Sequence, residues 1–197
     1  MTMKLSLTYR FLRAIGLNYS VEEYGQISLF EVIGRFFKNP YHLLLQKMMD
    51  SVILEPLNPR LLRSVFVRAL GAKVGKHVFF GDHVRIDNNH ADLITIEDYA
   101  HITGGCRLLC HQRDLSGYCK GDNAAKLPYK LGKIHIGKGV MIGMETLIMP
   151  GVTIGDGAIV GAYSLVTKDI PAWTIATGRP AKVVKEISDK QIKKDNE

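Results

Sequence analysis

The chain has 197 residues, a length that fits one domain or a domain with an appendage. Its formal net charge is +7, yet no basic run is interleaved with aromatic residues as in nucleic-acid binders, and no run approaches the roughly 18 apolar residues of a membrane span. Three cysteines, an odd number, argue against a disulfide framework and fit a reducing cytoplasm. We therefore expect a cytoplasmic protein without a signal peptide, whose charge suits an anionic membrane surface or a phosphorylated ligand.

The first 71 residues are predicted to form a helical region. Ser28 and Glu31 have the spacing of a capping box, so a helix should begin there. It should end at Asn39, because the residue before Pro40 disfavours the helical conformation.

Two more helices are expected before residue 72. The segment 41–54 carries leucines and methionines along one face. Asn58 as N-cap, Pro59 at the first helical position and Gly71 past the end frame a third helix. We expect this helix to cap the next part of the chain, although the basic amphipathic region could alternatively lie on the inner face of a membrane.

Residues 72–172 contain an aliphatic or aromatic residue at every sixth position, a period that neither a helix nor a flat strand has. Three hexapeptides make one triangular coil of a parallel β-helix, in which positions one and five point inward. A glycine often follows position one, as suits a corner with a sharp bend or a positive φ. The residues at position one are Val74, Phe80, Ile86, Ile96, Ile102, Leu108, Ile136, Ile142, Ile148, Ile154, Val160 and Val166.

Two insertions interrupt this period. Four extra residues follow Ile86, and a long external loop spans residues 111–133. Loops of that length inside a compact domain are usually functional or disordered. After Pro171, residues 173–197 are predicted to leave the prism as an extended segment and to end in a short helix.

The stretch PGVTIGDGAIVGAYSLVTKDIP, followed by GRPAKVV, resembles the hexapeptide-repeat acyltransferases of the xenobiotic, galactoside and maltose O-acetyltransferase type, and most closely the bacterial polysaccharide and lipopolysaccharide O-acetyltransferases. The resemblance covers residues 72 to about 187. It implies a mainly β protein with a left-handed parallel β-helix, a homotrimer, and acetyl-CoA bound between adjacent prisms. A trimer also fits flat faces that carry Met141, Leu147, Ile159 and Leu165, since extensive apolar patches usually mark an interface.

The resemblance places the catalytic base at His111, where the long loop leaves its coil. An alcohol is a weak nucleophile, so a base must remove its proton when it attacks a thioester, and imidazole suits this task. The group that orients His111 stays open among Asp114, Glu97, Asp98 and a backbone carbonyl.

The tetrahedral oxyanion needs a hydrogen-bond donor, for which the family suggests the backbone at Gly143 and Met144. The resemblance also implies contacts of the donor and of the acceptor saccharide, the latter a cell-envelope glycan or its precursor. The acceptor contacts would be Asp87, Asn88 and Asn89, and the acetyl-CoA contacts Met144, Ala162, Thr167, Lys168, Lys182 and Lys185.

Three alternatives remain. The zinc-binding γ-type carbonic anhydrases share the prism, but their histidine spacing is missing, so no metal is expected. A serine acetyltransferase-like enzyme would have a longer helical region and a different histidine–aspartate context. A catalytically silent scaffold would show no effect of acetyl-CoA on its melting temperature.

Overall fold

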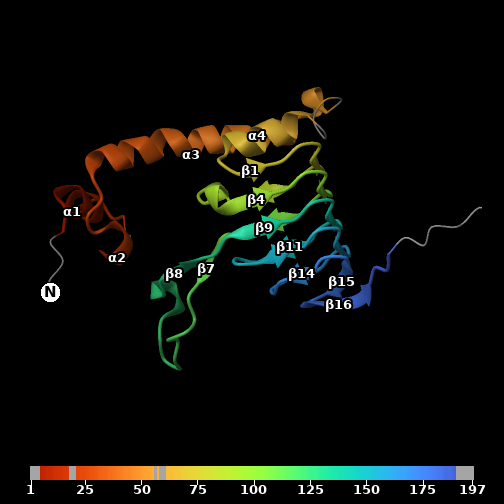
Figure 1. Cartoon of the computed structure of the whole chain (residues 1–197). Helices are drawn as coiled ribbons and strands as arrows, with labels where there is room; N and C mark the ends of the chain where they lie inside the picture. Colours follow the sequence, from red (N-terminus) through yellow and green to blue (C-terminus); the bar gives the residue numbers. More distant parts are fainter. Residues whose placement is uncertain (1–4, 18–20, 56, 58–60, 190–197) are drawn as a thin grey trace, which may run out of the picture.

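A computed structural model of the chain describes residues 5–17, 21–55, 57 and 61–189. It consists of a stack of short strands with helices at one end and a hairpin that projects from one side (Figure 1). The helices are α1 (Leu7–Ala14), α2 (Val21–Tyr24), α3 (Leu29–Met49), η1 (Val52–Leu54) and α4 (Arg63–Ala69).

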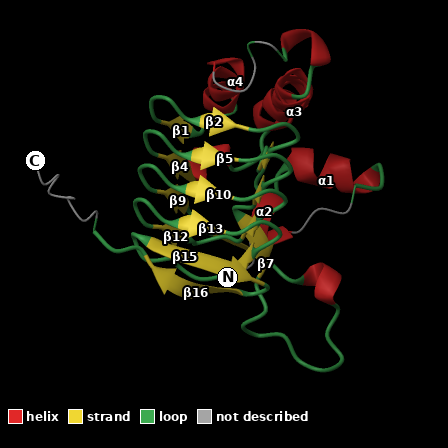
Figure 2. Ribbon diagram, turned by 90° about the vertical axis from the view of Figure 1, so that its right-hand side faces the viewer, coloured by secondary structure: helices red, strands yellow, loops and turns green. Residues whose placement is uncertain are grey.

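The strands form three parallel sheets that are the three faces of a β-helix (Figure 2). Sheet A contains β1 (Lys73–Val74), β4 (Ile94–Ile96), β9 (Ile134–Ile136) and β12 (Thr153–Ile154). Sheet B contains β2 (Phe79–Phe80), β5 (His101–Ile102), β10 (Met141–Ile142), β13 (Ile159–Val160), β15 (Thr174–Gly178) and the antiparallel β16 (Ala181–Glu186). Sheet C contains β3 (Arg85–Ile86), β6 (Arg107–Leu108), β11 (Leu147–Ile148) and β14 (Leu165–Val166).

The strand register confirms the six-residue period. Position-one residues lie directly above one another, as Ile86 pairs with Leu108 and Ile148 with Val166. All of them except Val74 are buried, and so are the residues at position five of the uninterrupted hexapeptides. The core is therefore a column of aliphatic side chains inside the prism, and the four-residue insertion after Ile86 ends in the short helix η3 (Ala91–Leu93).

The glycines after position one are not explained by a positive φ, which was one of the expected reasons for them. A Cβ on Gly81 would lie 2.3 Å from the backbone nitrogen of Gly104, and one on Gly143 would lie 2.4 Å from that of Ala162. These glycines are required because successive coils approach closely at that corner. Positive φ occurs instead three residues after position one, at His77, His83, Tyr99, Glu145 and Tyr163 and at Gly105, Gly139, Gly151 and Gly157.

The first two predicted helices differ from the structure at both ends of the second one: it is joined to the first as α3, and it stops at Met49 and not at residue 54, where η1 stands apart. The capping box of Ser28 and Glu31 is present, but α3 continues through Pro40 to Met49. The predicted end at Asn39 is wrong because the second half of α3 packs its buried side chains, among them Leu45 and Met49, against the prism. This tertiary packing outweighs the local cost of proline in a helix, about 3 kcal/mol.

The helix α4 covers the first coil, in contact with β1 and β2. It ends before Gly71, which has the expected positive φ of 112°. Its predicted beginning at Asn58 and Pro59 lies outside the described residues. Arg68 donates hydrogen bonds to the carbonyls of Val74 and Gly75, and thereby satisfies acceptors at the open end of the β-helix.

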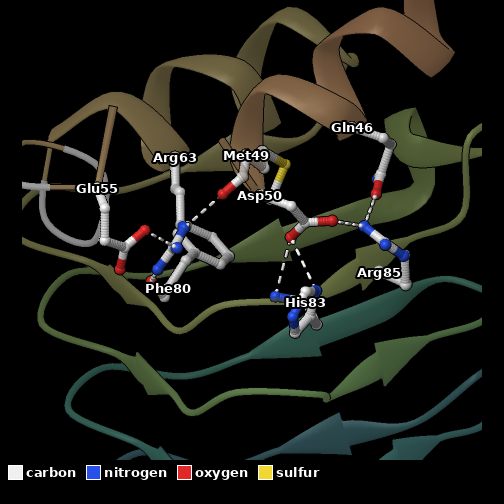
Figure 3. A network of polar contacts seen from close by, with 8 residues as sticks. All are labelled: Gln46, Met49, Asp50, Glu55, Arg63, Phe80, His83 and Arg85. Carbon is white, nitrogen blue, oxygen red and sulfur yellow. Dashed lines mark hydrogen bonds and ion pairs between the residues drawn. The ribbon is translucent and has the colours of Figure 1, made fainter. Parts of the chain in front are cut away.

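Buried polar side chains fix the helices to the first coil (Figure 3). Arg63 is 1% exposed and donates to the carbonyls of Met49 and Phe80 and to the Glu55 carboxylate. Asp50 accepts from Nη1 of Arg85 at 2.6 Å. Because these bonds join α3, α4, β2 and β3, the helical region and the prism form one packed unit.

The C-terminal segment forms a strand where a short helix was predicted. β16 turns back and pairs with β15 at the last coil, so residues 181–186 are a strand. Residues 190–197 lie outside the described part of the chain. Of the helices in the described ranges, none is long and apolar enough to cross a bilayer.

Candidate functional site

A hairpin leaves the prism at the edge between sheets C and A, which we call the C–A edge. It begins directly after β6, where β7 (His111–Arg113) pairs in antiparallel fashion with β8 (Tyr129–Leu131). Its tip contains the short helix η4 (Ala124–Lys126). The hairpin therefore occupies the predicted external loop and holds His111 at its base, against the wall of the prism.

Asp87 and His111 form a hydrogen-bonded pair at this edge. Asp87 follows β3 in the coil next to that of β6, and its Oδ2 atom lies 2.5 Å from Nδ1 of His111. The Asp87 side chain is 2% exposed, whereas that of His111 is 36% exposed. A carboxylate on Nδ1 favours the tautomer with its proton on that atom, so the Nε2 atom of His111 can accept a proton.

Backbone groups hold the Asp87 carboxylate in place. Oδ2 also accepts the N–H of Cys110 at 3.0 Å, while Oδ1 accepts those of Asn89 and His90. Burial alone would raise the pKa of Asp87, but the hydrogen bond from His111 and those from the backbone outweigh it and hold this pKa below its ordinary value. The carboxylate is therefore ionised and fixed beneath the imidazole.

The four candidates considered for the partner of His111 are wrong. Asp114 accepts the N–H of Ser116, Asp98 accepts that of Lys76, and Glu97 lies 3.3 Å from His135. The resemblance instead implies an acceptor contact for Asp87, because the insertion after Ile86 makes the alignment at this position insecure. Its burial and its hydrogen bonds make Asp87 a positioning residue for His111.

Aromatic rings flank the exposed side of the pair. Tyr129 packs edge-on against His111 with ring centroids 5.4 Å apart, and His90 lies at 5.7 Å. Arg113 lies over the Tyr129 ring, 4.0 Å from its centroid, and donates to the carbonyl of Leu127. Because Arg113 of β7 contacts both Tyr129 and the loop residue Leu127 that precedes β8, Tyr129 is held at a fixed place beside His111.

The other two predicted acceptor residues lie on the same edge. Asn89 is exposed, whereas the Oδ1 atom of Asn88 is buried and has no hydrogen-bond partner within the described chain. The carbonyl of Asn88 accepts a hydrogen bond from Nδ1 of His42 in α3 at 2.6 Å. Beside Asn88 is a cavity of about 220 Å³, lined by Leu43, Gln46, Lys47, Asp50, Arg85 and Asn88.

The predicted oxyanion donors lie at a different edge, between sheets B and C, which we call the B–C edge. The N–H of Gly143 donates to the carbonyl of Val160 at 2.8 Å, so it is not free to bind an oxyanion and this assignment fails. The N–H of Met144 makes no backbone hydrogen bond within the described ranges, and its side chain is 56% exposed. Met144 therefore remains the candidate donor.

The predicted acetyl-CoA contacts fall into three places. Met144 and Ala162 follow β10 and β13 and lie at the B–C edge, while Thr167 and Lys168 follow β14 at the C–A edge. Lys182 and Lys185 are on β16, at the end of the prism opposite the helices. All six residues are exposed.

Neither buried cysteine suits a role as nucleophile. Cys106 and Cys110 are both buried. Burial, together with the Asp87 and Asp92 carboxylates, raises the pKa of Cys110 to about 12. Its thiol is therefore protonated at neutral pH. Within residues 5–17, 21–55, 57 and 61–189, no three His, Cys, Asp or Glu side chains gather to hold a metal ion.

Comparison with known sequences finds similarity to bacterial hexapeptide transferases. Residues 133–168 match the family described as bacterial transferase hexapeptide (six repeats). The galactoside O-acetyltransferase of Escherichia coli is 32% identical over 144 residues, which are 65% of this chain and 70% of that protein. Proteins of Staphylococcus aureus are 50% identical over 60 residues, so the chain spans only 30% of the length of these relatives.

A solved structure has the same overall fold. The hexapeptide-repeat acetyltransferase of Vibrio cholerae, solved with acetyl coenzyme A, has a TM-score of 0.63 and 20% identity. The match covers 85% of this chain and 96% of that protein. Its likeness therefore extends well beyond the 36 residues of the repeat match.

Proposed function

This chain belongs to the bacterial hexapeptide-repeat acetyltransferases that include galactoside O-acetyltransferase, and we propose that it transfers an acetyl group from acetyl-CoA to a hydroxyl of a saccharide. The observation that carries this proposal is the Asp87–His111 pair at the base of the hairpin. The acceptor in the proposal is a cell-envelope glycan or its precursor. The left-handed sense of the β-helix and a cytoplasmic location, which fits three free cysteines, are part of it.

In the proposed reaction His111 acts on the acceptor. Its Nε2 atom takes the proton of the hydroxyl while the oxygen attacks the thioester carbonyl carbon of acetyl-CoA. The N–H of Met144 stabilises the resulting oxyanion. When the tetrahedral intermediate collapses, the C–S bond breaks, the ester forms, and the imidazolium returns its proton to the leaving thiolate. Asp87 stabilises the imidazolium between these two steps.

The proposed site needs a second copy of the chain. His111 is at the C–A edge and Met144 at the B–C edge, so the full width of sheet C separates them. At about 3.3 Å per residue, six residues span roughly 20 Å, far more than one acetyl group. We therefore include a homotrimer in the proposal, in which His111 of one prism meets Met144 of a neighbour. Exposed side chains at the B–C edge, Met144 and Tyr163, support such a contact.

Light scattering at micromolar concentration tests this assembly. A trimer is expected, and mixing His111→Ala chains with Met144→Pro chains should restore part of the activity. In a trimer of either variant alone, every site lacks His111 or the N–H of residue 144. A mixed trimer contains one site in which His111 of one copy meets Met144 of its neighbour. A monomer with an intact prism, or no recovery on mixing, contradicts the shared site.

The reaction itself is tested by release of the CoA thiol in the presence of a panel of saccharides. L-serine belongs in the panel. The histidine–aspartate context was one of the two features that distinguish the serine acetyltransferase alternative, and the Asp87–His111 pair means that this feature no longer argues against it. Turnover with serine alone would favour that alternative. If acetyl-CoA neither turns over with any acceptor nor raises the melting temperature, the chain is a scaffold.

A further inference from the structure

The longest helix presents a large apolar face away from the prism. The buried side chains of α3 are His42, Leu45, Gln46 and Met49, which all belong to its second half. On the opposite side the large apolar residues are exposed, and Phe30 at 87% is the most exposed of them. The exposed face of α3 consists of Leu29, Phe30, Ile33, Phe36, Phe37, Tyr41, Leu43 and Leu44.

The position of α3 leaves this face uncovered by the prism. α3 lies across the helical end of the stack, and its first half extends beyond the strands (Figures 1 and 2). His42 and Gln46, which point to the first coil, donate to the carbonyls of Asn88 and Ile86. Prisms that pack side by side, as in the proposed trimer, contact each other along their lengths. They would therefore leave the outer face at the end of the stack open.

The charge around this face is positive. α1 contains Arg10 and Arg13, and α3 contains Arg35, Lys38 and Lys47 against Glu31. With Glu22 and Glu23 of α2, five basic residues stand against three acidic ones in these helices. The Glu31 carboxylate is used in the capping box, where it accepts the N–H of Ser28. Among the ion pairs of the described residues, none includes these five basic side chains. Arg35 lies over the Tyr24 ring, 4.9 Å from its centroid, and the other four are available to anionic groups outside the chain.

The short helix α1 repeats the same pattern. Leu7, Phe11 and Ile15 are four residues apart and 81%, 64% and 58% exposed, so one face of α1 is apolar. Its other side buries Tyr9. Exposed aromatic and aliphatic residues next to arginines and lysines are the composition of helices that lie in the plane of a membrane surface.

We propose that α1 and the exposed face of α3 bind the surface of an anionic bilayer, with the phenylalanines at the boundary between headgroups and acyl chains. Apolar burial supplies most of the affinity, and Arg10, Arg13, Lys38 and Lys47 bind lipid phosphates. The bilayer fits better than a second trimer stacked end to end, because two such ends would bring like charges together. No helix of the described chain crosses the bilayer, so the binding is peripheral.

Flotation with lipid vesicles tests the proposal. The full chain should float with vesicles of equal parts phosphatidylglycerol and phosphatidylcholine, less with phosphatidylcholine alone, and less at high salt. Phe30→Glu/Phe37→Glu should bind at least about a hundredfold more weakly, because two buried aromatic side chains are lost. Phe30→Gln/Phe37→Gln, which adds no charge, should show the same loss in smaller measure.

A matched control adds the same two charges elsewhere. Leu115 in the hairpin and Val184 on β16 are 62% and 61% exposed and lie away from α3. Leu115→Glu/Val184→Glu should float almost as well as the unchanged chain. Equal losses in both double variants, or no binding of the unchanged chain to anionic vesicles, overturn the proposal. A larger oligomer that only Phe30→Glu/Phe37→Glu dissociates, without vesicle binding, would assign the face to a second trimer and also overturn it. CoA-thiol release on a soluble acceptor is measured separately, so the enzymatic proposal can fail independently.

Discussion

The Nδ1 atom of His111 lies 2.5 Å from the Oδ2 atom of Asp87, although 24 residues separate them in the sequence. The β-helix causes this contact, because Ile86 and Leu108 pair in adjacent coils and the turns that follow them meet at one edge. The carboxylate is buried and the imidazole is half-exposed. This arrangement suits the proposed role of His111 as the base, because Asp87 occupies Nδ1 and leaves Nε2 to accept a proton. It leads to specific expectations for both residues.

Replacement of His111 by Ala should lower kcat by about 10²- to 10⁴-fold, the usual contribution of a positioned general base. The affinity for acetyl-CoA should change little, because the base acts on the acceptor hydroxyl. In the unchanged enzyme, the rate should fall at acidic pH, since a protonated imidazole cannot accept a proton. Steady-state kinetics over a range of pH measure all three effects.

Two other histidines serve as controls for that experiment. His101 packs on Phe79 with ring centroids 4.1 Å apart, and His135 lies 3.3 Å from Glu97. Replacement of either by Ala should affect the melting temperature more than turnover. Full activity of His111→Ala on an established acceptor would disprove its role as base.

Asp87→Asn should lower kcat by about 10²-fold or more without changing the KM for acetyl-CoA. The amide can donate to Nδ1 and so favours the tautomer whose Nε2 carries a proton and cannot act as base. The acid limb of the pH–rate profile should also change, which a purely structural role would not produce. An unchanged profile with an unchanged kcat would show that Asp87 does not orient His111.

The pH dependence of stability provides a separate measure of Asp87. Its pKa in the folded chain lies below the ordinary value of 3.8, so the ionised form stabilises the fold. The difference in unfolding free energy between the unchanged chain and Asp87→Asn should be constant above about pH 5. It should shrink as the pH falls through the lowered pKa. Chemical denaturation at several pH values measures it, and a difference that grows toward low pH would contradict this interpretation.

The lysines of β16 should matter for the donor only. Lys182→Ala/Lys185→Ala is expected to raise the KM for acetyl-CoA, because the phosphates of the cofactor lose two cationic partners. For the same reason this KM should depend less on the salt concentration than in the unchanged enzyme. The kcat should stay nearly constant. Lys138→Ala is the control, since Lys138 is exposed but follows β9 at another edge. An unchanged KM in the double variant would move the phosphate site elsewhere.

The period of six was enough to predict the prism, because each hexapeptide buries the same two positions whatever its other residues are. Asp87 could not be assigned in the same way. Asp87 stands one residue after position one and His111 three residues after it, and the repeat is interrupted behind both, so the period alone does not pair the two side chains. A signal existed nonetheless, since Ile86 and Leu108 are equivalent positions and the residues that follow them must share an edge.

The structure differs from the sequence-based prediction at two further places, where contacts between distant segments outweigh local propensity. Pro40 does not end α3, because residues beyond it, such as Met49, gain more from burial against the first coil than the helix loses. The segment of Lys182 and Lys185 is a strand because β15 leaves an unpaired edge at the last coil, and β16 supplies its hydrogen bonds. In both cases a contact distant in sequence outweighs the propensity of the segment.

Arg63 should be essential for the attachment of the helices to the prism. Arg63→Ala removes the donor to the buried carbonyls of Met49 and Phe80 and leaves space where the side chain was. We expect a loss of about 3–5 kcal/mol in unfolding free energy, or a fall of roughly 10 °C in melting temperature. Glu55→Gln is the control, because Glu55 is 49% exposed and its amide can still accept the bond from Arg63, so the loss should stay below about 1 kcal/mol. Similar melting temperatures for Arg63→Ala and the unchanged chain would mean that apolar packing alone holds α3 and α4 in place.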